Sequence, residues 1–159
     1  MTRAHRRYLV GEMAIGAVIN TVLSGVFVLL VFGGRVRVPV AGWGGIAADA
    51  VPQSFMIALM SCLVPTLLTR RRLRAGAVAP MGRPTRLPRS APIRAVLVAL
   101  VIAVVAGVAQ AALLPATGAS WAFATILAFK LVYGALLGAA VAGYAARAAL
   151  GDPIVATGA

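Results

Sequence analysis

Residues 95–129 read AVLVALVIAVVAGVAQAALLPATGASWAFATILAF, which is 35 consecutive positions without a charged side chain. One helix needs about 20 residues to cross a hydrocarbon core about 30 Å thick, so this stretch is too long for a single span. It contains Pro115-Ala116-Thr117-Gly118, and a proline this close to a glycine favours a turn. We therefore expect two helices here, at about 93–114 and 120–146, with Lys130 inside the second.

Two further uncharged windows lie upstream and predict helices at about 9–32 and 50–69. In lipid every backbone polar group must find its partner within the segment or a closed barrel, and the apolar runs are continuous rather than alternating. The expected fold class is therefore an all-α integral membrane four-helix bundle. It consists of two helical hairpins that form a single membrane domain over residues 1–159.

The overall composition agrees with a membrane protein and argues against an enzyme. Hydrophobic residues make up 62% of the chain and charged residues 11%, with a mean hydropathy of +0.98. An ordinary soluble domain could not cover so much apolar surface with so few charges. The three carboxylates, one histidine and one cysteine are scattered, so we expect no catalytic set, no metal site and no cofactor.

The basic residues predict the orientation of the helices. The net charge is +12, and twelve of the fifteen cations lie in the N-terminal segment, the 70–94 loop or at Arg147. Only Arg35 and Arg37 lie on the opposite side. Because cytoplasmic loops carry the excess of Lys and Arg, we expect both termini and the loop in the cytoplasm of a bacterial plasma (inner) membrane. The membrane topology thus explains the positive charge, and we expect no nucleic-acid partner.

The 70–94 loop itself is basic and rich in regularly spaced prolines, so we expect part of it to be extended. Clustered cations beside a membrane attract anionic lipid headgroups by roughly 1 kcal/mol each. The candidates for such contacts are Arg70, Arg71, Arg72 and Arg74. The alternative is that this loop only determines topology.

The other side of the membrane carries a glycine-rich loop, residues 33–49, which we expect to cap the bundle. It contains Pro39-Val40-Ala41-Gly42-Trp43 before the second helix, and a similar Pro-to-Trp run, residues 115–121, begins the fourth helix. The two hairpins would then be parallel repeats, related by an axis along the membrane normal.

The first hairpin also carries a family resemblance. Helix one contains Asn20-x-x-x-Ser24-Gly25, and Val64-Pro65 lies shortly before the arginine run that starts at Arg70. On these motifs, residues 13–74 resemble a family of small bacterial membrane hairpins of uncharacterised function. The resemblance implies a fold and a membrane location, and no activity.

Lys130 is the least expected residue of the chain, because a lysine at a helix centre costs roughly 2.5–3.5 kcal/mol on insertion scales. Asn20 and Ser61 are expected at similar depth, and Glu12 shares a helix face with Asn20 about 12 Å nearer the cytoplasm. We predict a polar site within the membrane from these four residues. The alternative is a structural lysine that is hydrogen-bonded or reaches an interface.

Small residues recur every four positions in the last two helices and predict close helix packing. They include Ala99, Ala103 and Gly107 in the third helix, and Gly134 and Gly138 in the fourth. We expect these stripes to pack the third and fourth helices together, with a homodimer interface as the alternative.

The expected function is that of a small permease- or channel-like protein that moves a small anion or a proton through the polar site. The alternative is a non-transporting accessory or scaffold subunit of a larger membrane complex. The expected partners are the lipid bilayer, anionic headgroups and either further copies of the chain or that complex. The two functions differ in the role of Lys130: transport requires this residue, whereas a scaffold does not.

Overall fold

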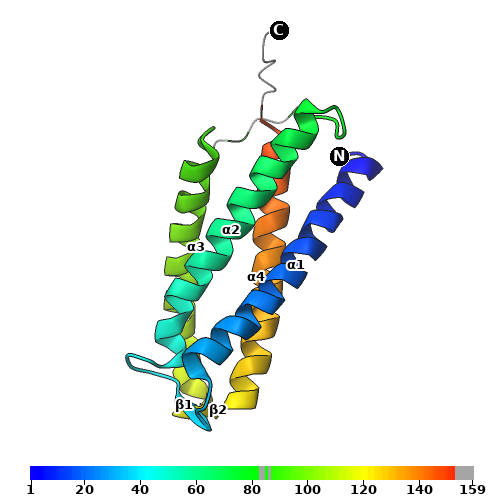
Figure 1. The fold of residues 1–159 in the computed structure, drawn as a ribbon. Helices are drawn as coiled ribbons and strands as arrows, with labels where there is room; N and C mark the ends of the chain where they lie inside the picture. Colours follow the sequence, from blue (N-terminus) through cyan, green and yellow to red (C-terminus); the bar gives the residue numbers. More distant parts are fainter. Residues whose placement is uncertain (83–84, 86, 153–159) are drawn as a thin grey trace.

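The computed structural model describes residues 1–82, 85 and 87–152, and in this part of the chain four long helices pack into a bundle (Figure 1). The helices are α1 (Arg3–Phe32), α2 (Ile46–Arg74), α3 (Ala91–Leu113) and α4 (Phe123–Leu150). The predicted all-α bundle of four helices is therefore confirmed. Each helix is long and apolar enough to cross a membrane. Arg83, Pro84 and Arg86 of the predicted basic loop lie outside the described residues.

The helix ends follow from local chemistry. The Thr2 side chain caps α1 by accepting a hydrogen bond from the backbone N–H of His5 at 3.2 Å. After α3 the chain forms the short 3-10 helix η1 (Leu114–Thr117), and Gly118 then adopts a φ of 124° that an L side chain rarely takes. The predicted turn is therefore confirmed.

A short antiparallel pair of strands links the two halves of the chain. β1 (Arg37–Pro39) pairs with β2 (Ser120–Ala122), and the central partners are Val38 and Trp121. The prediction that the fourth helix begins at residue 120 is wrong, because residues 120–122 form this ladder and α4 begins at Phe123. Beneath it Val38 packs into an apolar cluster with residues of α1, α2 and α4.

At the other end, the helices extend into the segment predicted as a loop. α2 continues through Arg74, where its basic last turn complements the partial negative charge at the helix C-terminus. α3 already begins at Ala91, so the connection is shorter than the predicted 70–94 loop. Two bonds hold it to the bundle: His5 Nε2 donates to the Ala79 carbonyl at 2.9 Å, and Met81 N to the Leu150 carbonyl at 2.8 Å.

The helices are arranged with α2 and α4 in the centre. α1 packs mainly against α4, α3 packs mainly against α2, and the consecutive helices α1 and α2 meet only slightly (Figure 1). The pattern of contacts is symmetric: if α1 is exchanged with α3 and α2 with α4, the same main interfaces result. The β1–β2 pair joins the two halves. Such an exchange is what the predicted parallel repeat requires.

The small residues serve these interfaces, with partners that differ from the prediction. A Cβ added at Gly138 would lie 2.7 Å from the Cβ of Asn20 in α1, and one at Gly107 would lie 2.6 Å from Val51 in α2. Ala99 likewise packs in a cluster with Ala58 of α2. The expectation that the third and fourth helices pack together through these stripes is therefore wrong.

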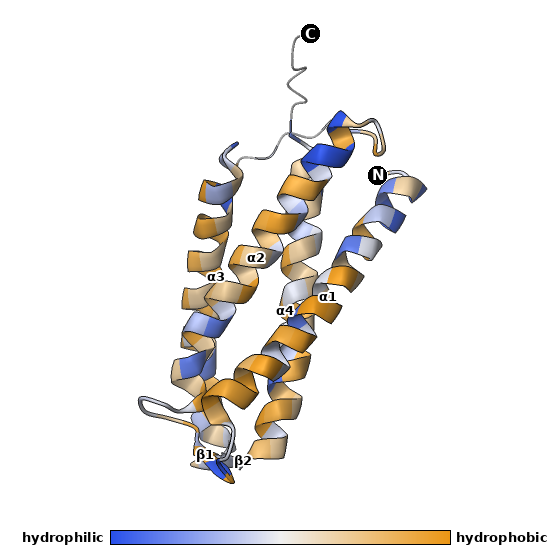
Figure 2. Cartoon of the chain, in the orientation of Figure 1, coloured by the Kyte–Doolittle hydropathy of each residue, from blue (hydrophilic) through white to orange (hydrophobic). Residues whose placement is uncertain are grey.

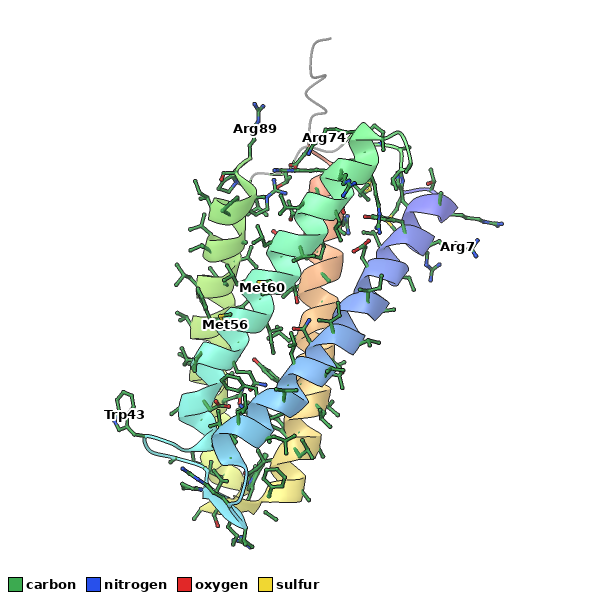
Figure 3. All side chains as sticks on the ribbon, in the orientation of Figure 1. Arg7, Trp43, Met56, Met60, Arg74 and Arg89 are labelled. Atoms are coloured by element: carbon green, nitrogen blue, oxygen red, sulfur yellow. The ribbon has the colours of Figure 1, made fainter. Side chains whose placement is uncertain are left out.

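The helices are mostly hydrophobic along their length, and hydrophilic residues gather toward the ends of the bundle (Figure 2); many large apolar side chains of the helices are exposed. Met56 and Met60 are half exposed on the outer face of α2 (Figure 3). Arg7, Arg74 and Arg89 lie at the end where α1 starts and α4 finishes, which we call the arginine end (Figure 3). Trp43 is fully exposed at the opposite end, beside β1 and β2, which we call the strand end.

Candidate functional site

The ammonium of Lys130 is completely buried and holds two oxygens from α2. Its Nζ donates to Gln53 Oε1 at 2.6 Å and forms an ion pair with Asp49 Oδ2 at 2.8 Å. The side chain of Lys130 is 0% exposed and that of Asp49 8%. A charge so far from water is stable only when paired and hydrogen-bonded, and here α2 supplies both requirements to α4.

The ion pair lies near the strand end. Asp49 belongs to the first turn of α2, where the partial positive charge of the helix N-terminus favours a carboxylate. Lys130 and Gln53 each lie seven residues after the first residue of their helices, which is about 10 Å along the axis. Asp49 is therefore nearer to the surface of that end than the lysine it binds.

Further polar side chains lie at the same depth and come from all four helices. Gln53 Nε2 donates to Ser24 Oγ of α1 at 3.3 Å, and Ser54 Oγ lies 2.5 Å from Tyr133 Oη of α4. Gln110 of α3 faces Tyr133, and its buried amide has no hydrogen-bond partner among the described residues. We call this set the polar layer; it comprises Ser24, Asp49, Gln53, Ser54, Gln110, Lys130 and Tyr133.

Asn20 and Ser61 form a second, separate contact one helical turn away, toward the arginine end. Asn20 Nδ2 donates to Ser61 Oγ at 2.9 Å and to the Gly16 carbonyl at 2.8 Å. The predicted site placed both residues around Lys130, whereas the described bonds of Lys130 go to Gln53 and Asp49. Asn20 therefore bridges α1 to α2 on the side of the polar layer that faces the arginine end.

Glu12 lies at the arginine end and belongs to a third cluster. It forms an ion pair with Arg72, whose Nη1 also donates to Tyr8 Oη at 3.1 Å. Tyr8 Oη is in turn 2.8 Å from Thr69 Oγ1. Eight residues separate Glu12 from Asn20, about 12 Å along α1, so the four predicted residues are divided among three clusters.

Two of the four arginines predicted to meet lipid headgroups are already paired. Arg72 binds Glu12, and Arg70 binds Asp152 with Nη2 to Oδ2 at 2.6 Å. Arg71 and Arg74 remain exposed in the last turns of α2. Together with Lys130 and Asp49, these contacts place all three acidic side chains of the chain in ion pairs.

Sequence reasoning missed most of the polar layer. The predicted site did not include Asp49, the charged residue just before the helix predicted at 50–69, although it lies four residues before Gln53 and so shares its helix face. Tyr133 and Gln110 were likewise absent from the predicted site. The i, i+3 spacing of Lys130 and Tyr133 on α4 could have indicated that the two side chains point to the same side.

No protein-family model, curated protein or solved structure matches this chain. The resemblance of residues 13–74 to small membrane hairpins therefore stays a prediction. Chemically, the polar layer combines a carboxylate and an ammonium that can exchange a proton over 2.8 Å with amides and hydroxyls that can orient water. This arrangement suits proton binding inside an otherwise apolar bundle.

Proposed function

We propose that the chain is a small permease-like protein that moves protons across a bacterial plasma membrane by way of the Lys130–Asp49 pair. The observation that carries the proposal is a fully buried lysine paired with a carboxylate at 2.8 Å within helices long enough to span a bilayer. Ionisable groups inside membrane spans are rare and belong mostly to substrate or proton pathways.

The orientation proposed with it is both termini on the cytoplasmic side. Arginines gather at the arginine end, where Arg7, Arg74 and Arg89 project outward, and cytoplasmic segments carry such an excess. The strand end, with exposed Trp43, then faces the periplasm. Asp49 becomes the group nearest to the periplasm and Lys130 the group behind it.

The pair can pass a proton in a cycle of three steps that returns both side chains to their starting state. A proton from the periplasmic side binds the Asp49 carboxylate and leaves the Lys130 ammonium without its counter-charge. The ammonium then releases a proton toward the cytoplasmic side and becomes a neutral amine. Transfer of the proton from the Asp49 carboxyl to Lys130 Nζ restores the starting state.

A proton is favoured over a small anion because the positive charge of Lys130 is already neutralised. An anion would have to displace Asp49, which is covalently fixed to α2 and supported by the helix N-terminus. A proton needs no such displacement, because it binds the carboxylate itself.

The accessory-subunit alternative draws less support from the arrangement of small residues. Gly134 and Gly138 pack against α1, and Gly107 packs against α2. These small-residue stripes are therefore occupied by helices of the same chain. They are not free to bind the helices of a larger complex or of a second copy.

The test is proton flux into proteoliposomes that hold the purified protein and a pH-sensitive dye, driven by a pH step. Wild type is expected to raise the rate above that of empty liposomes, and Lys130→Ala to abolish the increase. Arg147→Gln, which changes an exposed cation of the same helix, is the matched control and should leave the flux unchanged. A Lys130→Ala protein that folds and conducts like wild type would refute the proposal.

A further inference from the structure

At the arginine end, two guanidinium groups from different helices converge on one carboxylate. Arg94 of α3 binds Asp152 in a bidentate manner, with Nη2 to Oδ1 at 2.7 Å and Nη1 to Oδ2 at 3.2 Å. Arg70 of α2 adds two bonds to Oδ2, from Nε at 2.9 Å and from Nη2 at 2.6 Å. Asp152 directly follows Gly151, the residue at the end of α4. Four hydrogen bonds therefore hold a single anionic group between three helices.

The cationic part of this cluster is built into the fold. The side chain of Arg94 is 0% exposed, and its Nε donates to the Pro88 carbonyl at 3.1 Å. Arg70 Nη2 donates to the Arg89 carbonyl at 2.6 Å. Both guanidiniums are thus also held by backbone oxygens of the segment before α3, in addition to their bonds to Asp152.

The charges of the cluster do not balance. Two guanidiniums face one carboxylate, which leaves one excess positive charge. The N-terminus of α3 lies beside them and adds partial positive charge. Its N-cap residue, Ser90, makes no side-chain capping bond in the described part of the chain. The cluster therefore suits an anion with more than one negative charge.

We propose that Arg70 and Arg94 form a binding site for a phosphate monoester, which Asp152 occupies as a built-in competitor. A phosphate monoester carries about −1.5 to −2 charges at pH 7 and offers three acceptor oxygens. It would match both guanidiniums in charge, and its oxygens fit the planar fork of each arginine. Asp152, with one charge and two oxygens, meets the same donors less completely. This site is independent of the proposed proton pathway.

The cluster lies at the end of the bundle proposed to face the cytoplasm, where two sources of a phosphate monoester exist. One is the headgroup of a phosphatidic-acid lipid at the membrane surface, and the other is a phosphorylated metabolite in solution, for which inorganic phosphate is the probe because it has the same charge and acceptor oxygens. The backbone N–H of Asp152 donates to the Ala149 carbonyl at the end of α4, so release of the carboxylate requires rotation of the Asp152 side chain or loss of this bond.

The test compares Asp152→Asn with wild type in unfolding experiments. Removing the competing charge should tighten phosphate binding by about tenfold or more, seen as a lower phosphate concentration at half-maximal stabilisation. Glu12→Gln is the matched control, because it removes a carboxylate from another arginine at the same end, and it should titrate like wild type. Sodium chloride at equal ionic strength corrects for screening.

Two arms distinguish the source of the phosphate. In the first, the protein in phosphatidylcholine nanodiscs is titrated with inorganic phosphate; in the second, the nanodiscs contain increasing phosphatidic acid and no free phosphate. Tighter binding by Asp152→Asn in either arm supports the site and assigns its source. Equal responses of Asp152→Asn and Glu12→Gln in both arms, or no saturable response, would overturn it.

A second variant keeps the test decisive if Asp152→Asn does not fold. Arg70→Gln leaves Arg94 and Asp152 as a balanced pair, so the folded protein should lose the saturable stabilisation that wild type shows at high phosphate or phosphatidic acid. An Arg70→Gln protein that responds like wild type would refute the site.

Discussion

Removing the charge of Lys130 alone should destabilise the protein much more than removing both charges of its ion pair. Breaking a buried pair by deleting one partner costs about 3–5 kcal/mol, because the other charge stays buried without compensation. The exposures of 0% for Lys130 and 8% for Asp49 place this pair at the buried limit. Lys130→Met should therefore lower the folded-to-unfolded ratio by a factor between roughly 10² and 10⁴.

The double variant Asp49→Leu/Lys130→Met should recover most of this loss, because an apolar replacement of a buried pair is often neutral or stabilising. The assay is reversible unfolding in mixed micelles as the detergent SDS is increased, followed by circular dichroism. The two single variants and the double variant should give a coupling free energy of at least about 2 kcal/mol.

The Glu12–Arg72 pair provides the matched control. The side chain of Glu12 is only 5% exposed, but that of Arg72 is 40% exposed, so solvent screens this pair on the arginine side and it should contribute less than a pair with both charges buried. The cycle with Glu12→Gln and Arg72→Met should therefore show a clearly smaller coupling than the Lys130–Asp49 cycle. A coupling of the Lys130–Asp49 pair within about 0.5 kcal/mol of zero would refute the reasoning, because two charges in a buried pair cannot act independently.

Three further results are expected. Gly138→Ala should destabilise the bundle by about 1–3 kcal/mol in the same unfolding assay, since its Cβ would meet Asn20, whereas Gly11→Ala, which meets nothing within 4 Å, should be neutral or stabilising; equal effects would contradict the α1–α4 packing. Gln110→Met should raise stability by about 1 kcal/mol, because the buried amide has no well-formed hydrogen bond among the described residues, and a loss instead would indicate that it binds Tyr133 or water. Arg74→Cys and Trp43→Cys should react with a membrane-impermeant maleimide from opposite sides of the membrane, and labelling from one side would refute the orientation; the single native cysteine is buried.

The helices could be predicted because the physics that specifies them is local. Uncharged windows long enough to span a bilayer, and a proline–glycine turn at residues 115–118, identify four helices from composition alone. The errors lie at the ends. Residues 120–122 pair with β1 from the other half of the chain, and residues 70–74 continue α2, and neither outcome is encoded in hydropathy.

The partners of the helices could not be predicted, because small-residue stripes indicate close packing without saying against which helix. Gly138 meets α1 because each outer helix packs against the central helix of the other half of the chain, α1 on α4 and α3 on α2. This arrangement is a property of the assembled bundle. The composition of the polar layer could not be predicted for the same reason. Lys130 was identified by its cost in a membrane span, whereas Asp49 was seen as a boundary, since only the packing of α2 on α4 brings the two together.

The proposal that the Lys130–Asp49 pair carries protons is tested most directly by the proton flux of Asp49→Leu/Lys130→Met in proteoliposomes. This variant is expected to keep the fold, so its flux separates the proton chemistry of the pair from its structural role. The account predicts a flux equal to that of empty liposomes, with wild-type protein clearly above it at the same density. A double variant that is folded and moves protons at the wild-type rate would contradict it.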